Sequence, residues 1–345
     1  MWTADLLDLA KRAAVVWAVG LLIILLIVGV GYAIDVLLLA FAGVLFAILL
    51  RGLSDFLSTH TGMGEKWSLA ATVLLLMVLV TVGAWLLIPS IAEQTDELRQ
   101  TLPKSVELLE GQVKRYEWGR WMLEKAPEPA ELIPRRLDLF RRITGVVSGT
   151  LGAIGIVVVV FFTGLFFAIQ PRLYTEGIVK LVMIRKRDRA REVIGQIGAE
   201  LQWWLIAKLT AMLFVGGLTW LGLWLLGIGM PLTLAVLAAL LTFIPNLGPI
   251  IAAVPAVLIA LLDGPATAVW VVVLYIAIQT IESYLLTPLL QQQAVSLPPA
   301  LTITAQLVMA VFVGGIGLAL ATPLTVVVLV LVRSLYVQDM LGDEA

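Results

Sequence analysis

The chain has 345 residues, of which 61% are hydrophobic and 14% charged, whereas soluble domains have about 45–50% apolar and about 25% charged residues. This composition excludes a water-soluble fold and predicts an all-α polytopic membrane protein. The 23 basic and 24 acidic side chains leave a net charge of −1, so the overall charge does not indicate nucleic-acid binding. Cysteine is absent and histidine occurs once, so disulfides and the usual metal ligand sets are not expected.

About 20 apolar residues cross the ~30 Å hydrocarbon core as a helix. A shorter run at 36–50 needs its flank up to Phe56 to cross, and Asp35 is expected in a connection before it. The first apolar run follows Lys11 and Arg12 and is too long for a signal peptide, so it is expected to remain as a membrane helix. The sequence predicts about six transmembrane helices, the other five being residues 13–34, 68–88, 148–169, 201–226 and 266–290.

Charged residues gather in two segments that set the expected domain organisation. The stretch around Pro103, Pro127 and Pro134 predicts a water-exposed helical insertion in the periplasm. The basic cluster Arg185–Arg191 is the strongest cytoplasmic marker, and it predicts cytoplasmic N- and C-termini in a bacterial inner membrane. The expected units are N-terminal transmembrane helices at 1–91, the insertion at 92–147, a transmembrane helix and basic cytoplasmic linker at 148–200, a transport core at 201–333 and a polar tail at 334–345.

Two long apolar stretches in the C-terminal half, 231–262 and 298–332, are each broken in the middle. Adding 67 to positions 231, 248 and 255 gives 298, 315 and 322, so the helix-breaking residues recur almost in register. The breakers are Pro245, Asn246, Gly248, Pro249 and Pro255 in the first stretch, and Gly314, Gly315, Gly317 and Pro323 in the second.

Backbone that leaves the helix at membrane depth is tolerated only where protein or a water-filled cavity satisfies its polar groups. If both stretches are re-entrant hairpins, the units 201–262 and 266–333 form an inverted repeat, which is typical of secondary transporters with a site between the hairpin tips. Two very short spans in each stretch would leave the C-terminus on the same side, so orientation alone does not decide between these alternatives.

A few polar residues in these apolar segments are candidates for the site. Glu282, one turn after Gln279, is an intramembrane carboxylate, and such groups are functional candidates by default. It could couple transport to protons, contact the solute, or form a structural ion pair with Lys208 at a similar depth. Asn246 could contact the solute or only form a turn, and the glycines at 314–317 could form a tip or a close helix contact.

Nucleotide and catalytic motifs are missing from the sequence. There is no G-x-x-x-x-G-K-[ST] loop to bind nucleotide phosphates and no G-x-S-x-G nucleophile motif. We therefore expect no enzyme activity and no cofactor. The energy for transport is then expected to come from an ion gradient or from the gradient of the solute itself.

The segment Phe243–Pro255 resembles the F-I-P-x-x-G-P-x-I-A-x-x-P signature of the autoinducer-2 exporter family. Residues 279–288, with Gln279, Glu282 and Pro288, are similar to its Q-x-x-E-x-x-x-x-T-P segment. Gly314, Gly317 and Pro323 match its G-x-x-G-x-x-x-x-x-P segment. After Pro288 the family commonly has basic residues, whereas this chain has Leu289 and the glutamines 291–293, which argues against recognition of an anionic solute there.

The resemblance implies a homo-oligomer, expected to be a pentamer, that moves a small solute by an elevator-like mechanism with paired hairpins. It implies autoinducer-2 or a similar molecule as the exported solute. The alternative within transport is a sodium or lithium/proton antiporter that uses Glu282, with H⁺ or Na⁺ as partners. An alternative of another class is a non-transporting membrane scaffold that binds a partner through its insertion.

Overall fold

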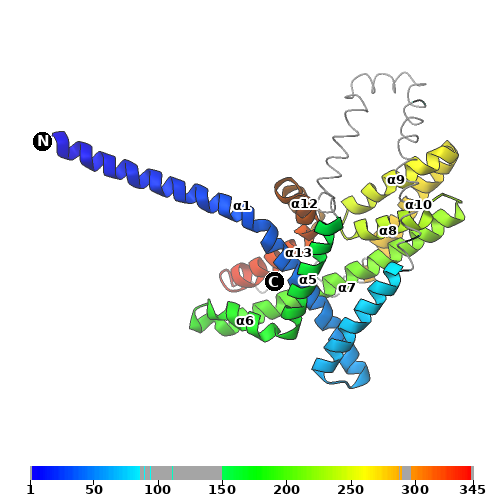
Figure 1. The fold of residues 1–345 in the computed structure, drawn as a ribbon, viewed down its shortest axis with the longest axis horizontal. Helices are drawn as coiled ribbons and strands as arrows, with labels where there is room; N and C mark the ends of the chain where they lie inside the picture. Colours follow the sequence, from blue (N-terminus) through cyan, green and yellow to red (C-terminus); the bar gives the residue numbers. More distant parts are fainter. Residues whose placement is uncertain are drawn as a thin grey trace.

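The computed structural model describes residues 2–85, 150–286, 288–289 and 297–342, together with positions 89, 94 and 111. In these ranges the chain is α-helical with short 3₁₀ and π segments, and no strand is formed (Figure 1). This confirms the all-α class. The predicted insertion at 92–147 lies outside the described residues, except for Gln94 and Gly111.

The first helix, α1, runs without a break from Trp2 to Thr61. Two spans with a connection at Asp35 were expected here, and that expectation is wrong. The segment has no proline, and a single aspartate in a helix interior costs less than about 1 kcal/mol, so nothing in it forces a turn. At 1.5 Å per residue α1 is ~90 Å long, and its N-terminal part extends away from the other helices (Figure 1).

The C-terminal half of α1 packs against α5 (Thr150–Ile169) and against the helix Glu65–Trp85. Small residues allow α1 and α5 to approach closely, because a Cβ added at Gly43 would lie 2.9 Å from Thr163 Cγ2. Such small-residue contacts are common between helices in membranes. The two helices agree with the spans predicted at 148–169 and 68–88.

The chain bends by 82° between α5 and α6, which runs from Pro171 to Lys180. Gln170 is non-helical and Pro171 occupies the first turn of α6, as expected because a proline disfavours helical backbone in the residue before it. The short 3₁₀ helix η2 (Ile184–Lys186) leads into α7 (Arg187–Leu225). The basic cluster expected in a linker is therefore mainly helical, and it extends the predicted span at 201–226 toward the N-terminus.

Two helical hairpins form most of the C-terminal half. The first consists of α8 (Pro231–Thr242) and α9 (Leu247–Asp263), and the second of α12 (Pro299–Val313) and α13 (Gly315–Leu331). Both expected breaks are confirmed.

The hairpins repeat with a constant offset of 68, one more than the sequence suggested. An offset of 68 separates three pairs of equivalent positions. They are the starts of the first arms (231 and 299), the residues before the second arms (246 and 314) and the ends of the second arms (263 and 331). The interior prolines Pro255 and Pro323 keep the same offset.

Helix α10 (Pro265–Ile281) continues into the π-helical segment η3 (Glu282–Leu286), and α13 continues into the π-helical segment η4 (Val332–Gln338). One apolar core joins α7, α8, α9 and α10, and a second joins α1, α7 and α13. Helix α7 contributes to both, with Leu201 and Leu205 in the second core and Val215 and Leu223 in the first.

Among the described residues, five helices are long and apolar enough to cross a membrane, or six if α5 and α6 count as one bent span. This agrees with the expected number. Helices α8, α9 and α12, with 12, 17 and 15 residues, are shorter than a full crossing, whereas the segment Gly315–Gln338 has 24 residues.

Candidate functional site

The tip of the first hairpin is a tight turn from Phe243 to Asn246. Asn246 has φ 64° and ψ −50°, is exposed, and precedes the first residue of α9 without a side-chain capping bond. Asparagine is among the few residues that accept positive φ readily. Gly248 is buried beneath α8, and a Cβ there would overlap the carbonyl oxygen of Leu241. Both residues are therefore required by the turn itself.

The tip of the second hairpin is a single residue, Gly314, at φ 79° and ψ −146°. Gly315 begins α13, and Gly317 packs against the end of α12. A Cβ at Gly317 would lie 2.6 Å from both Met309 O and Val313 Cβ. Gly317 is thus a close-packing glycine, whereas Gly314 forms the turn.

The two hairpins meet at Gln306, a residue that sequence reasoning did not single out. Its side chain is completely buried in α12, and Nε2 donates to the carbonyl oxygen of Pro245 at 3.0 Å. Nε2 also lies 3.4 Å from Oγ1 of Thr322 in α13, which is 1% exposed. An uncharged amide in an apolar helix is a weak sequence signal, but Gln306 is fully buried where α12 meets the tip of the first hairpin.

The amide oxygen of Gln306 has no hydrogen-bond partner among the described residues. A buried acceptor without a donor costs about 1–3 kcal/mol. The Pro245 carbonyl accepts from the Gln306 amide nitrogen where the backbone has left the helix. The amide nitrogen is thus paired, whereas the amide oxygen is not. The contact between the first tip and the middle of α12 therefore has spare hydrogen-bonding capacity.

A second polar group lies where α10 changes from α-helix to π-helix. Gln279 Nε2 donates to Glu282 Oε2 at 2.6 Å and to Ser283 Oγ at 3.1 Å. The π segment begins at Glu282, and π-helical turns are frequent at functional sites. The structure thus brings Gln279 and Glu282 together, as their spacing of three residues suggested.

Lys208 lies on α7, near enough to Glu282 for the two charges to interact. Neither side chain is in an ion pair within 4 Å with any residue that the structure describes. The carboxylate is instead held by the amide of Gln279. The direct structural pair that was one of the alternatives is therefore not formed in this conformation.

The predicted prolines have different positions. Pro255 and Pro323 are buried inside α9 and α13, and Pro249 lies in the first turn of α9. Pro245 is half-buried in the first tip and takes part in the contact with Gln306. Pro288 is exposed, two residues beyond the π segment η3.

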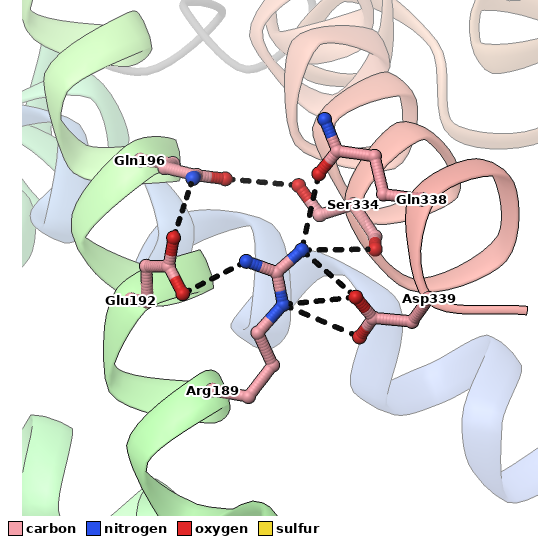
Figure 2. A network of polar contacts seen from close by, with 6 residues as sticks. All are labelled: Arg189, Glu192, Gln196, Ser334, Gln338 and Asp339. Atoms are coloured by element: carbon pink, nitrogen blue, oxygen red, sulfur yellow. Dashed lines mark hydrogen bonds and ion pairs between the residues drawn. The ribbon is translucent and has the colours of Figure 1, made fainter. Parts of the chain in front are cut away.

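A further polar network joins the N-terminal part of α7 to η4 (Figure 2). Arg189 Nε donates to both carboxylate oxygens of Asp339, at 3.1 and 3.2 Å, and Nη2 donates to the Ser334 carbonyl at 3.2 Å. Nη2 also donates to Gln338, while Ser334 Oγ donates to Gln196 Oε1 at 2.9 Å. No pattern in the sequence indicates this network, because its partners are separated by about 140–150 positions.

A cavity of about 280 Å³ lies beside this network. It is lined by Gln196, Glu200, Leu329, Val330, Arg333, Ser334 and Gln338. The cavity is therefore formed by the N-terminal half of α7 together with the end of α13 and η4.

The sequence profile described as AI-2E family transporter matches residues 15–336. "Putative transport protein YueF" of Bacillus subtilis (strain 168) is 26% identical over 335 residues, covering 90% of each chain. "Putative transport protein YhhT" of Escherichia coli (strain K12) is 24% identical over 321 residues, covering 88% of this chain and 86% of the relative. The profile covers nearly the whole chain, and the five or six apolar helices agree with a multi-pass membrane protein of this kind. The chain belongs to the AI-2E transporter family.

Proposed function

We propose that this chain is a secondary transporter that moves a small solute across the bacterial inner membrane by alternating access at the meeting point of its two helical hairpins. The observation that carries the proposal is the bond from the buried Gln306 amide to the Pro245 carbonyl in the broken tip of the first hairpin. A polar contact of this kind, with an open acceptor, is expensive in an apolar core unless a ligand or a second conformation makes use of it.

The two hairpins fit the architecture of transporters with broken helices. In each hairpin at least one helix is too short to cross the membrane: α8 has 12 residues and α12 has 15. Equivalent positions of the two hairpins are 68 residues apart. In such proteins non-helical backbone and helix ends at membrane depth bind the substrate or the coupling ion. We therefore assign the solute path to the region between the tips, near Asn246, Gly248, Gly314, Gly315 and Gly317, with Gln306 added.

The transport cycle that we propose is elevator-like, with re-entrant hairpins in an inverted repeat. The first hairpin packs in the core with α7 and α10, and the second packs in the core with α1 and α7. The two cores meet at the first tip, where Phe243 packs against the second core and Pro245 accepts the bond from Gln306. Relative movement of the cores would break and remake the Gln306 contact. The family resemblance adds a homo-oligomer, a pentamer, as the assembly in which this movement takes place.

The coupling group that we propose is Glu282. A carboxylate at the start of a π-helical turn, bonded to an amide and close to a lysine, can exchange a proton as its surroundings change. This arrangement also favours a second candidate function, exchange of Na⁺ or Li⁺ for H⁺. The solute proposed for the first function is autoinducer-2 or a similar small polar molecule.

Flux measurements in proteoliposomes test the proposal and separate the two functions. Purified protein is reconstituted, and radiolabelled autoinducer-2 and internal pH are followed with and without an imposed proton gradient. Solute flux that depends on the gradient supports the exporter, and proton movement on addition of Na⁺ or Li⁺ alone supports the antiporter. Absence of both fluxes, in vesicles whose protein is shown to be folded, overturns both and favours the scaffold.

A further inference from the structure

Helix α6 and the turn that follows it expose a row of large apolar side chains. Leu173 is 62% exposed and Ile178 is 56% exposed, and in the turn Leu181, Met183 and Ile184 reach 88%, 70% and 78%. Large apolar side chains that the rest of the chain leaves uncovered mark a contact with another molecule or with a membrane.

The bend between α5 and α6 indicates where this row lies relative to the bilayer surface. Helix α5 is apolar along its length and ends at Ile169, where the chain bends by 82°. At the bend, Arg51 Nε donates to the Ala168 carbonyl at 2.6 Å and satisfies one of the free carbonyls at the end of α5. A guanidinium at this level marks the edge of the hydrocarbon, so α6 leaves the end of a span and runs along the membrane surface.

The opposite side of α6 is fixed to the rest of the protein. Val179 is fully buried, and Tyr174 packs edge-on against Phe167 of α5 with ring centroids 4.6 Å apart. Arg191 of α7 holds Glu176 with two hydrogen bonds, at 2.7 and 3.0 Å. The row from Leu173 to Ile184 is therefore presented by a helix fixed to its neighbours and by the turn that follows it, and no described part of the chain covers it.

Cations border the apolar row. They are Arg172, Lys180, Arg185 and Lys186, all exposed, and none of them is in an ion pair with a residue that the structure describes. An amphipathic helix with apolar side chains on one face and Lys or Arg at its border lies in the membrane interface and attracts anionic lipids. A second copy of the same face would bring these cations against one another, which disfavours a self-contact.

We propose that α6 and residues 181–186 form an interfacial anchor, in which the apolar row enters the boundary between headgroups and acyl chains and the four cations bind anionic phospholipid headgroups. The apolar surface continues from Phe166 and Ile169 of α5, which are 59% and 49% exposed, so α5 and α6 present one lipid-facing surface around the bend. The inference is independent of which solute is transported.

The absence of cysteine allows a direct test with single spin labels. Leu181→Cys reports on the apolar row, and Asp188→Cys is the matched control, because the Asp188 side chain in the first turn of α7 is fully exposed. The full-length protein is placed in vesicles of phosphatidylcholine and phosphatidylglycerol in equal parts. We expect the label at 181 to be relaxed by oxygen but not by a water-soluble nickel chelate, and the label at 188 to show the reverse.

The charge component is tested with the triple variant Lys180→Gln/Arg185→Gln/Lys186→Gln. Spin-labelled phosphatidylglycerol should associate with the unaltered protein in preference to spin-labelled phosphatidylcholine. Each cation removed should lower that preference roughly fivefold, corresponding to about 1 kcal/mol per cation near the surface. The altered residues are exposed, so the variant is expected to fold, and its phosphatidylcholine association serves as the control.

Two results would overturn the anchor. Equal access of the nickel chelate to labels 181 and 188 would place the row in water, and strong spin–spin broadening at 181 would show that a second copy covers it. An unchanged lipid preference in the triple variant would remove the headgroup site. Solute flux is measured in the same vesicles, so that a loss of transport is distinguished from a loss of anchoring.

Discussion

Gln306 of α12 donates a hydrogen bond to the carbonyl oxygen of Pro245, 61 residues earlier in the chain, and this bond connects the two hairpins. Replacing Gln306 by Met keeps the volume but removes one of the two hydrogen bonds that the Pro245 carbonyl accepts, the other coming from Leu247 N at 2.7 Å, while it also removes the unsatisfied amide oxygen. These effects partly offset each other, so we expect a change in unfolding free energy of no more than about 1–3 kcal/mol. Transport should fall much more, because the first tip loses its polar contact with the second hairpin.

The control for this variant is Leu307→Met, on the exposed side of the same helix. It should leave flux and thermal stability unchanged. Flux in Gln306→Met that equals that of the control would remove Gln306 from the solute path.

The tight turns predict which glycines cannot be replaced. Gly248→Ala would place a Cβ against the backbone carbonyl of Leu241, and Gly317→Ala would place one 2.6 Å from Met309 O. Backbone atoms in a packed hairpin cannot move aside cheaply, so both variants should lose several degrees of Tm or fail to assemble. Gly155→Ala in α5 meets nothing within 4 Å and should be tolerated. Equal Tm values for all three would contradict the packing described here.

The hydrogen bond from Gln279 to Glu282 predicts the behaviour of Glu282→Gln. Because Glu282 is in no ion pair with a described residue, the variant should assemble with normal yield. If Glu282 is the coupling group, flux should persist but lose its dependence on pH, since an amide resembles a protonated carboxyl. Asp263→Asn, at the exposed end of α9, serves as the control.

Two other outcomes for Glu282→Gln would contradict its role as the coupling group. Collapse of the Glu282→Gln yield and its rescue by Lys208→Met would show that the two residues form a structural pair in another conformation. Normal flux with unchanged pH dependence would exclude both roles.

The network around Arg189 predicts local loosening rather than global unfolding. Arg189→Gln removes the bonds to Ser334, Gln338 and Asp339, and hydrogen exchange of residues 332–339 should rise severalfold. The exposed Arg185→Gln is the control. The change in Tm should be small, because ion pairs between partly exposed side chains contribute little net stability. Unchanged exchange would mean that other contacts hold η4 in place.

The pKa of Glu176 predicts how the contact between α6 and α7 responds to acid. The hydrogen bonds from Arg191 hold the pKa of this carboxyl below its ordinary value. A lowered pKa in the folded state means that the contact is fully present above the ordinary pKa of ~4.3 and is lost as pH falls further. A spin label at Leu173→Cys should therefore keep its low mobility from neutral pH to about pH 4 and gain mobility below it. With Glu176→Gln the mobility of the label should no longer change with pH; a transition near neutral pH in the unaltered protein would contradict this assignment.

The sequence identified the hairpins because their breaks depend on local chemistry. Proline starts α8 and α12, and Asn246 and Gly314 have positive φ, which few other residues adopt. The offset of 67 was off by one, because the glycines that were aligned, Gly248 and Gly315, do not have equivalent positions in their turns.

The predictions from sequence were wrong or incomplete at positions whose structure depends on contacts with distant parts of the chain. The charge of Asp35 predicts the end of a span, yet α1 has no helix breaker there and continues through this residue. Gln306 was not singled out, since an amide carries no charge and its burial follows from packing between two hairpins. The Arg189 network joins segments about 150 positions apart, and no single-sequence pattern indicates such a pairing.

Helix α7 has a mechanical consequence for the whole protein. Its first half belongs to the core with α1 and α13, and its second half to the core with α8, α9 and α10. Gly216 and Gly217 lie where the second of these cores begins, and glycine weakens a helix locally by about 1 kcal/mol. The two cores are thus joined by one continuous helix, α7, which is locally weakened at Gly216 and Gly217. In the elevator-like movement that we propose, displacement of one core relative to the other would bend α7, so the stiffness of this helix would limit the amplitude of the movement.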